Sequence, residues 1–282
     1  MPGLRRHTSR EKFIGALMDS DKKLRALMLR IFSGQTDPGT KDFHPLRAIV
    51  ENFNKGEHDE ATWLAFLCIH FGWTRQGGKS AETVRLFYRK FGKGKWDWKT
   101  VVRSPADVRE WMLTLSKAEL KQLKFGNHRK YETNNPSSAI GTPAVITSFV
   151  EWVRQNGDSS AWQAFVSAKK IGATPEAAFD FLYESLGQVK RFGRTAKFDF
   201  LCLLGNLGIL DVVPAHCYLH DSTGPRAGAL LLVIGGKEGS LTPQIEGIVR
   251  KLRNSLGVPV EALEDALCIW QKGKGFVSRM CS

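Results

Sequence analysis

Apolar residues recur at helical spacing along most of the chain. In the first long segment they fall at Phe13, Leu17, Leu24, Leu27, Met28, Ile31 and Phe32. Residues with this spacing share one face of a helix, so the pattern predicts amphipathic helices packed against one another. Only residues 98–102 and 230–234 also suit a strand, and both segments are short enough to belong to a helix. The periodicity therefore predicts an all-α fold.

Four Ser-Pro or Thr-Pro pairs precede amphipathic runs and mark predicted helix starts. They are Ser104-Pro105, Thr142-Pro143, Thr174-Pro175 and Thr242-Pro243. In each pair the hydroxyl group can accept a hydrogen bond from the first helical turn, where proline needs no donor of its own. The longest polar segment between helices covers residues 124–141. We therefore expect two helical lobes, residues 1–124 and 125–282.

The charge balance indicates a polyanionic partner. The chain has 41 Lys and Arg against 28 Asp and Glu, which gives a net charge of +13. Binding to phosphates releases condensed counterions, so we expect double-stranded DNA as the partner, with a basic surface that binds nothing as the alternative. There is no apolar stretch long enough to span a bilayer, and residues 1–13 lack the apolar core of a secretory signal. We expect a cytoplasmic protein without a membrane segment.

The cysteines give no sign of a metal or cofactor. They lie at positions 68, 202, 217, 268 and 281, without a C-x-x-C pair. We therefore expect reduced thiols and no iron–sulfur cluster. His216, Cys217, His220 and Asp221 carry atoms that can bind zinc, but no second ligand pair stands nearby, so we interpret them as loop residues. The sequence predicts no metal and no cofactor.

Polar chemistry is densest in the segment FGNHRKYE at residues 125–132. Arginine and lysine bind phosphate, tyrosine stacks on bases, and asparagine and histidine can contact base edges. We expect an exposed loop that binds DNA, with a solvated connection between helices as the alternative. The predicted DNA-binding residues are Asn127, His128, Arg129, Lys130 and Tyr131.

A glycine turn opens an apolar helix at residues 193–211. The first N–H groups of such a helix point toward an anion, so we predict that Gly193 and Arg194 contact DNA phosphate. Asp199 falls inside the apolar run, where a carboxylate is costly unless it has a partner or a catalytic role. Asp211 lies at the end of the run. Either carboxylate can stabilise positive charge on a sugar during glycosidic cleavage, while an ion pair with Arg194, Lys197 or a distant cation is the alternative for Asp199.

A second glycine turn, STGPRAGA, covers residues 222–229. Gly224 can adopt a positive φ, Pro225 suits the first helical position, and Arg226 can pair with phosphate. We predict that Thr223, Gly224 and Arg226 contact DNA. Simple helix initiation is the alternative.

These segments, with EDALCIWQKGKG at 264–275, resemble the α-glutamyl/putrescinyl thymine pyrophosphorylase clade 3 family. That family is a divergent branch of the helix-hairpin-helix DNA glycosylase fold. The resemblance implies a two-lobed helical enzyme that acts on hypermodified pyrimidines in DNA. Our first hypothesis is a glycosylase, a hydrolase that flips out and excises such a base. Its expected biological role is anti-phage defence. The second is a transferase that attaches an amino acid or polyamine to activated 5-hydroxymethyluracil, and the third is a DNA-binding module without catalysis.

The sequence departs from the usual glycosylase pattern. If residues 222–229 form the hairpin, the place of the catalytic Asp falls near Pro243, which cannot serve. If residues 189–196 form it, Asp211 lies near the expected distance, but Lys190 or Arg191 replaces the first glycine of the hairpin. We rank Asp199 ahead of Asp211 because it lies within the matching segment.

Overall fold

The computed structural model describes residues 1–30, 35–72, 79–169 and 174–273, and the described chain is all-α. Fourteen α-helices and four short 3-10 helices cover these residues. The described residues form no sheet, only isolated bridges between Gln35 and Phe43 and between Thr133 and Gly141. Residues 98–102 and 230–234, which the sequence left open between strand and helix, are helical. The predicted fold class is confirmed.

The contacts divide the chain into two compact units. The central unit is Met28–Val213, and the terminal unit joins Met1–Leu27 to Pro214–Ser282. The expected division at residues 124 and 125 differs from these boundaries. A cut there would split one core, because α11 (Arg194–Asn206) packs against α3 (His58–His70), and α8 (Thr142–Gly157) packs against α6 (Ala106–Thr114).

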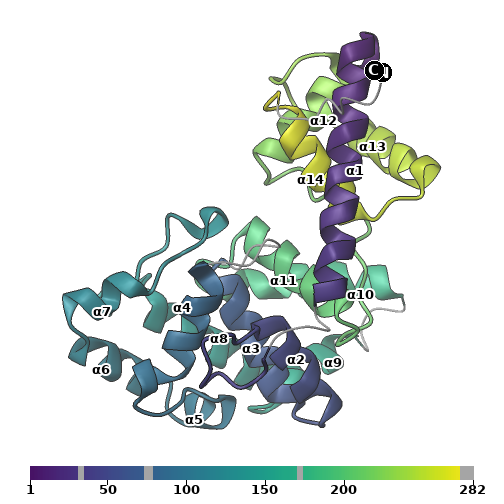
Figure 1. Ribbon diagram of the computed structural model, residues 1–282. Coiled ribbons are helices and arrows are strands. Elements are labelled where there is room, and N and C mark those ends of the chain that lie inside the picture. The colour runs from purple at the N-terminus through teal and green to yellow at the C-terminus, as the bar shows by residue number, and fades with distance from the viewer. Residues whose placement is uncertain (31–34, 73–78, 170–173, 274–282) are drawn as a thin grey trace. The chain divides into compact units, whose positions relative to one another are not determined.

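In the terminal unit, three helices from the end of the chain lie with the first long helix (Figure 1). The helices are α1 (His7–Arg30), α12 (Gly224–Ile234), α13 (Pro243–Leu256) and α14 (Val260–Trp270), preceded by the 3-10 helix η1 (Pro2–Leu4). Phe13 meets Trp270 edge to face at 5.2 Å, and the hydroxyl of Ser20 donates to Asp265 at 2.8 Å. Contacts between α12 and α14 are dense.

Gly224 is a packing residue of this unit. The expectation of a positive φ is wrong, because Gly224 is the first residue of α12 and its φ is not among the positive values. A Cβ atom there would lie 2.5 Å from the Sγ of Cys268, and one at Gly228 would lie 2.3 Å from the carbonyl oxygen of Leu267. Both glycines therefore let α12 approach α14 closely.

The central unit builds its core around α3, in which every residue from Ala61 to His70 is buried. Phe66 of this helix stacks on Phe149 of α8 at 4.0 Å and on Phe192 at 5.5 Å. The other helices of the unit are α2 (Pro45–Asn54), α4 (Lys79–Tyr88), α5 (Trp98–Arg103), α7 (Lys117–Gln122), α9 (Ala161–Lys169), α10 (Pro175–Ser185), η2 (Lys90–Gly92), η3 (Asn127–Arg129) and η4 (Leu186–Gln188).

The four predicted helix starts behave in two ways. Thr174 and Thr242 cap α10 and α13 by accepting hydrogen bonds from the N–H groups of Ala177 and Ile245, as expected. Helices α6 and α8 also begin at the predicted pairs, but their N-cap residues are Pro105 and Gly141. The hydroxyl of Thr142 is engaged elsewhere, in a buried polar network.

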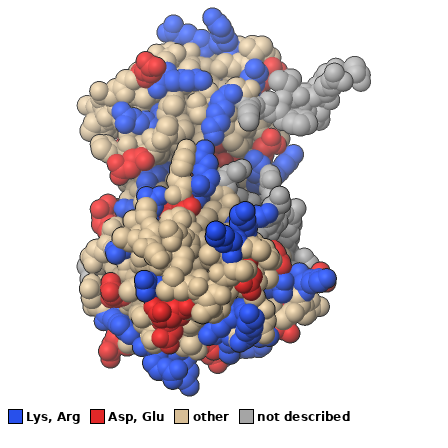
Figure 2. Space-filling model, turned by 90° about the vertical axis from the view of Figure 1, so that its left-hand side faces the viewer, with Lys and Arg blue, Asp and Glu red and all other residues tan. Residues whose placement is uncertain are grey.

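Lys and Arg side chains form several separate groups, with Asp and Glu between them, on the face that Figure 2 shows. The positive charge on this face is not one continuous stripe, so the net charge alone does not locate a binding site. Among the described residues, no helix combines the length and the apolar character that crossing a bilayer requires.

Candidate functional site

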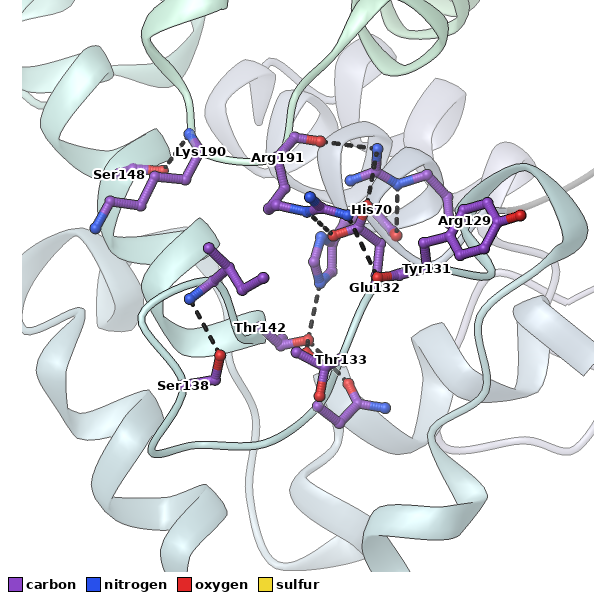
Figure 3. A network of polar contacts seen from close by, with 12 residues as sticks. His70, Arg129, Tyr131, Glu132, Thr133, Ser138, Thr142, Ser148, Lys190 and Arg191 are labelled. Carbon is purple, nitrogen blue, oxygen red and sulfur yellow. Dashed lines mark hydrogen bonds and ion pairs between the residues drawn. The ribbon is translucent and has the colours of Figure 1, made fainter.

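Two segments that the sequence singled out meet in the central unit (Figure 3). Arg191 donates from Nε to Glu132 Oε2 at 2.9 Å and from Nη2 to Glu132 Oε1 at 3.2 Å. The same Nη2 also donates to the carbonyl oxygen of Tyr131 at 3.3 Å. In the other direction, Arg129 Nη1 donates to the carbonyl oxygen of Arg191 at 2.9 Å. The 125–132 loop and the turn before α11 are therefore held together by reciprocal contacts, which we call the Arg129–Glu132–Arg191 cluster.

The side chain of Arg129 is buried, so its expected exposure is wrong. Its side chain is only 7% exposed, with Nε donating to the carbonyl oxygen of His70 at 3.3 Å. Nη1 also lies 3.7 Å from Glu132 Oε1, whereas Nη2 is buried without a hydrogen-bond partner. Burial lowers the pKa of the guanidinium, and the charges of Glu132 and Asp199 oppose that effect. Arg129 thus positions the loop from inside the protein.

Two glycines make room for Arg129. A Cβ at Gly72 would lie 2.9 Å from Arg129 Cγ, and one at Gly126 would lie 2.0 Å from the carbonyl oxygen of Gly72. The N–H of Gly126 donates to Phe71 at 2.8 Å. The start of the 125–132 loop therefore lies directly on the end of α3.

A second buried network fixes the other end of the loop. His70 Nε2 lies 3.0 Å from the hydroxyl of Thr142, and that hydroxyl donates to Asn134 Oδ1 at 2.8 Å. Because the hydroxyl proton goes to Asn134, we assign the proton of the imidazole to Nε2. Burial lowers the pKa of His70 well below its ordinary value, and the charge of Arg129 acts in the same direction. His70 is therefore a neutral donor that ties α3 to α8.

Arg191 has a left-handed backbone, with φ of +60°. Such a conformation costs a residue with a side chain about 1 kcal/mol and persists where neighbouring contacts impose it. Here the contacts to Glu132 and Arg129 hold Arg191, and the N–H of Lys190 donates to Ser148 Oγ at 2.9 Å. Phe192, which follows, is 2% exposed and anchors the turn in the core.

The turn leads into an N-terminus of α11 that is open to an anion. Gly193 is the N-cap residue, no side chain caps the helix, and a Cβ at Gly193 would meet nothing within 4 Å. The first N–H groups of a helix attract negative charge, and Lys190, Arg194 and Lys197 lie within four positions of Gly193 in the sequence. The guanidinium of Arg194 lies 4.7 Å from the Phe198 ring, and Lys197 Nζ lies 3.9 Å from the ring of Tyr183.

The two candidate carboxylates lie at different places on α11. Asp199 is partly exposed in the second turn, and its charge favours the protonated form of Arg129. This is a weaker effect on Arg129 than that of Glu132, and it does not identify the partner of Asp199. Asp211 is exposed and follows the C-terminal end of α11. The catalytic roles of Asp199 and Asp211 both stay predictions.

The remaining predicted DNA contacts differ in their surroundings. His128 and Lys130 are exposed, and Tyr131 is 78% exposed with Lys130 Nζ 4.9 Å from its ring. The side chain of Asn127 lies outside the described part of the structure. Thr223, Gly224 and Arg226 belong to the terminal unit, where Arg226 Nη2 donates to the carbonyl oxygen of Gly239 at 3.2 Å.

The sequence analysis did not identify the polar residues whose hydrogen bonds support the cluster. His70, Thr142, Asn134 and Ser148 all hydrogen-bond within the site. The one available signal was a histidine near the end of the apolar run 61–71, where a buried polar group needs a partner. Within the described ranges, no three His, Cys, Asp or Glu side chains are grouped as metal ligands. His220 instead lies 3.1 Å from Asp221 in an exposed pair.

Comparison with known proteins agrees with the sequence resemblance. The sequence model of the α-glutamyl/putrescinyl thymine pyrophosphorylase clade 3 family matches residues 8–279, nearly the whole chain. No curated protein and no solved structure matches the chain.

Proposed function

The chain belongs to the α-glutamyl/putrescinyl thymine pyrophosphorylase clade 3 family, and on that premise we propose that it is a transferase acting on modified thymine in duplex DNA. The proposed substrate is 5-hydroxymethyluracil activated as its pyrophosphate ester. An amine or amino acid replaces the pyrophosphate group. The family description supports this reaction over excision of the base, which was our first hypothesis from sequence.

The observation that carries the proposal is the N-terminus of α11. Four N–H groups without intrahelical acceptors are a general feature of a helix start, and here no side chain caps them. Lys190, Arg194 and Lys197 lie within four positions of the N-cap residue Gly193 in the sequence, so this part of the chain is positively charged. A pyrophosphate leaving group carries several negative charges, so its departure is favoured by an electropositive, preorganised site.

The reaction is a nucleophilic displacement at the methylene carbon on C5 of the pyrimidine. The nitrogen lone pair of the amine forms the new C–N bond, and the C–O bond to pyrophosphate breaks with its electron pair going to the leaving group. The proton released from nitrogen goes to a carboxylate, for which we propose Asp199. Arg129, Glu132 and Arg191 position the turn that precedes α11. Base extrusion from the duplex would expose the methylene group to this site.

Excision is the second candidate, and the left-handed Arg191 favours it. Glycine is the residue that most readily adopts a positive φ, and Arg191 adopts one at the position that the first glycine of a hairpin would take before α11. With this hairpin, Asp211 becomes the carboxylate at the expected spacing. It would stabilise the developing charge on the sugar.

One experiment separates the two reactions. The protein is incubated with duplex DNA containing the pyrophosphate ester of 5-hydroxymethyluracil, together with putrescine or glutamate, and the nucleosides are analysed by mass spectrometry. Transfer predicts release of pyrophosphate and a heavier nucleoside in intact DNA. Excision predicts a free base and alkali-labile DNA. Alkali-labile sites without pyrophosphate release would refute the transferase proposal, and DNA left unchanged in both respects would refute both reactions.

A further inference from the structure

A dense basic segment follows α4 and has no part in the site described above. The 89–95 loop, with sequence RKFGKGK, contains Arg89, Lys90, Lys93 and Lys95 and no acidic residue. Lys95 pairs with Asp97 at 2.9 Å, and Lys93 lies 3.9 Å from Glu119 on α7. Four cations thus share two nearby carboxylates, and a positive charge remains on the loop.

The backbone of the 89–95 loop is left-handed over several residues. The φ angles of Lys90 and Phe91 are +47° and +55°, and those of Gly92 and Gly94 are +90° and +142°. Two consecutive residues with side chains in this region are costly, so the surroundings must impose the shape. Strain of this kind is concentrated at binding sites in proteins.

Buried contacts hold the loop in this shape. The N–H of Gly92 donates to Arg89 at 2.7 Å, and the N–H of Trp96 donates to Tyr88 at 2.7 Å, which closes the loop at its base. Trp96 is 2% exposed, and its carbonyl oxygen accepts from Trp63 Nε1 at 2.7 Å. Lys90 Nζ lies 3.5 Å from the centre of the Trp96 ring, so one cation is fixed against the same anchor. The loop is preorganised for a ligand.

The turn at Arg89 and Lys90 has the geometry of an anion-binding nest. Arg89 has φ of −85° and ψ of 9°, which is right-handed, and Lys90 is left-handed. The N–H of Arg89 donates to the carbonyl oxygen of Arg85 in α4 at 2.9 Å, and the succession turns the next two N–H groups, those of Lys90 and Phe91, toward one side. A phosphate group fits both this nest and the cations around it.

We propose that the 89–95 loop is a second phosphate-binding site, which contacts the DNA backbone away from the candidate active site. The proposal rests on DNA as the substrate of the proposed function. Both sites lie in the central unit and are joined through α4, since the hydroxyl of Thr83 donates to Lys124, next to the 125–132 loop. The 89–95 loop follows the C-terminal end of α4, only about 8 Å of helical rise from Thr83. Our proposal is that one duplex contacts both sites.

The test measures how affinity for an unmodified 25-base-pair duplex depends on salt. Each phosphate contact contributes about 0.9 to the slope of log K against log salt concentration. The variant Arg89→Gln with Lys90→Gln is expected to lower the slope by about one to two. The matched control is Lys117→Gln with Lys121→Gln, which removes the same charge from exposed positions on α7. Equal slopes for the two double variants would overturn the proposal.

A second variant tests the shape of the loop without changing its charge. A Cβ at Gly92 would meet nothing within 4 Å, so Gly92→Ala acts only through the positive φ. Gly56 has φ of +81° and equally open surroundings, and Gly56→Ala is the matched control. We expect several-fold weaker binding for Gly92→Ala alone. Equal affinity of the two glycine variants, both folded by circular dichroism, would contradict the preorganised site.

These measurements separate the proposal from the proposed function. They use unmodified duplex DNA and need no turnover, so a wild-type protein without transferase activity still gives a salt slope. A wild-type salt slope for the variant Arg89→Gln with Lys90→Gln would refute the second site whether or not the protein releases pyrophosphate.

Discussion

The charge of Glu132 is expected to stabilise the protein by far more than an ordinary surface ion pair. Glu132→Gln keeps the size of the side chain and an acceptor for Arg191 but removes the charge between two arginines. The side chains of Glu132 and Arg129 are each 7% exposed. Loss of one partner from a buried pair costs about 3–5 kcal/mol, and water around Arg191, which is 34% exposed, reduces this figure. We therefore expect the free energy of unfolding to fall by about 2–4 kcal/mol.

Urea unfolding followed by tryptophan fluorescence measures this change. Glu110→Gln is the control, because Glu110 pairs with Arg109 at 2.8 Å while both side chains are at least half exposed. An exposed pair contributes about 0–1 kcal/mol. If Glu132→Gln cost no more than Glu110→Gln, Arg129 would not depend on this carboxylate, and our account of the cluster would be refuted.

Three further predictions concern single groups. Burial raises the pKa of Glu60 to about 7, so protonated Glu60 favours the folded state and its contribution to stability is lost as pH rises from about 4.5 to 7. The free energy of unfolding of Glu60→Gln should therefore rise by up to about 3 kcal/mol relative to that of the wild type between pH 5 and pH 8, and parallel stability curves would contradict this. Asp199→Asn should fold, bind DNA and lose most turnover, with Asp211→Asn as its control; an active Asp199→Asn beside an inactive Asp211→Asn would invert our assignment and favour excision. Lys130→Ala should weaken DNA binding without loss of stability, whereas Arg129→Ala should destabilise the protein; equal melting temperatures would show that Arg129 is not an anchor.

Local features of the sequence predicted the helices well. Periodic apolar residues and Ser/Thr-Pro pairs act within a few positions, so helix starts near 105, 142, 175 and 243 could be placed without knowledge of the fold. The role of the Thr142 hydroxyl could not be predicted in this way, because its partner His70 lies 72 positions earlier. The same local rule that capped α10 was overridden at α8 by a long-range contact.

The candidate site was predicted in part. The segment 125–132 was selected for its chemistry and residues 189–196 as a possible hairpin, and their contact through Arg129, Glu132 and Arg191 is a structural result. Sequence placed Arg129 on an exposed loop because its neighbours are polar. Its burial depends on two close glycines, Gly72 and Gly126, which come from different segments. Local polarity therefore predicted the exposed residues of the loop correctly but did not predict the burial of Arg129.

The terminal unit joins two segments that lie far apart in the sequence, and this has a consequence for synthesis on the ribosome. Residues up to Leu27 are made first, yet they pack with helices that begin at Gly224. At about 5–20 residues per second, α1 leaves the ribosome some tens of seconds before helices α12–α14 are available. During that interval Phe13, Leu17 and Leu24, which are buried in the finished protein, have no native partner, while Met28–Val213 can complete its own core. The apolar face of α1 therefore stays without its native partners for longer than the core of Met28–Val213 does.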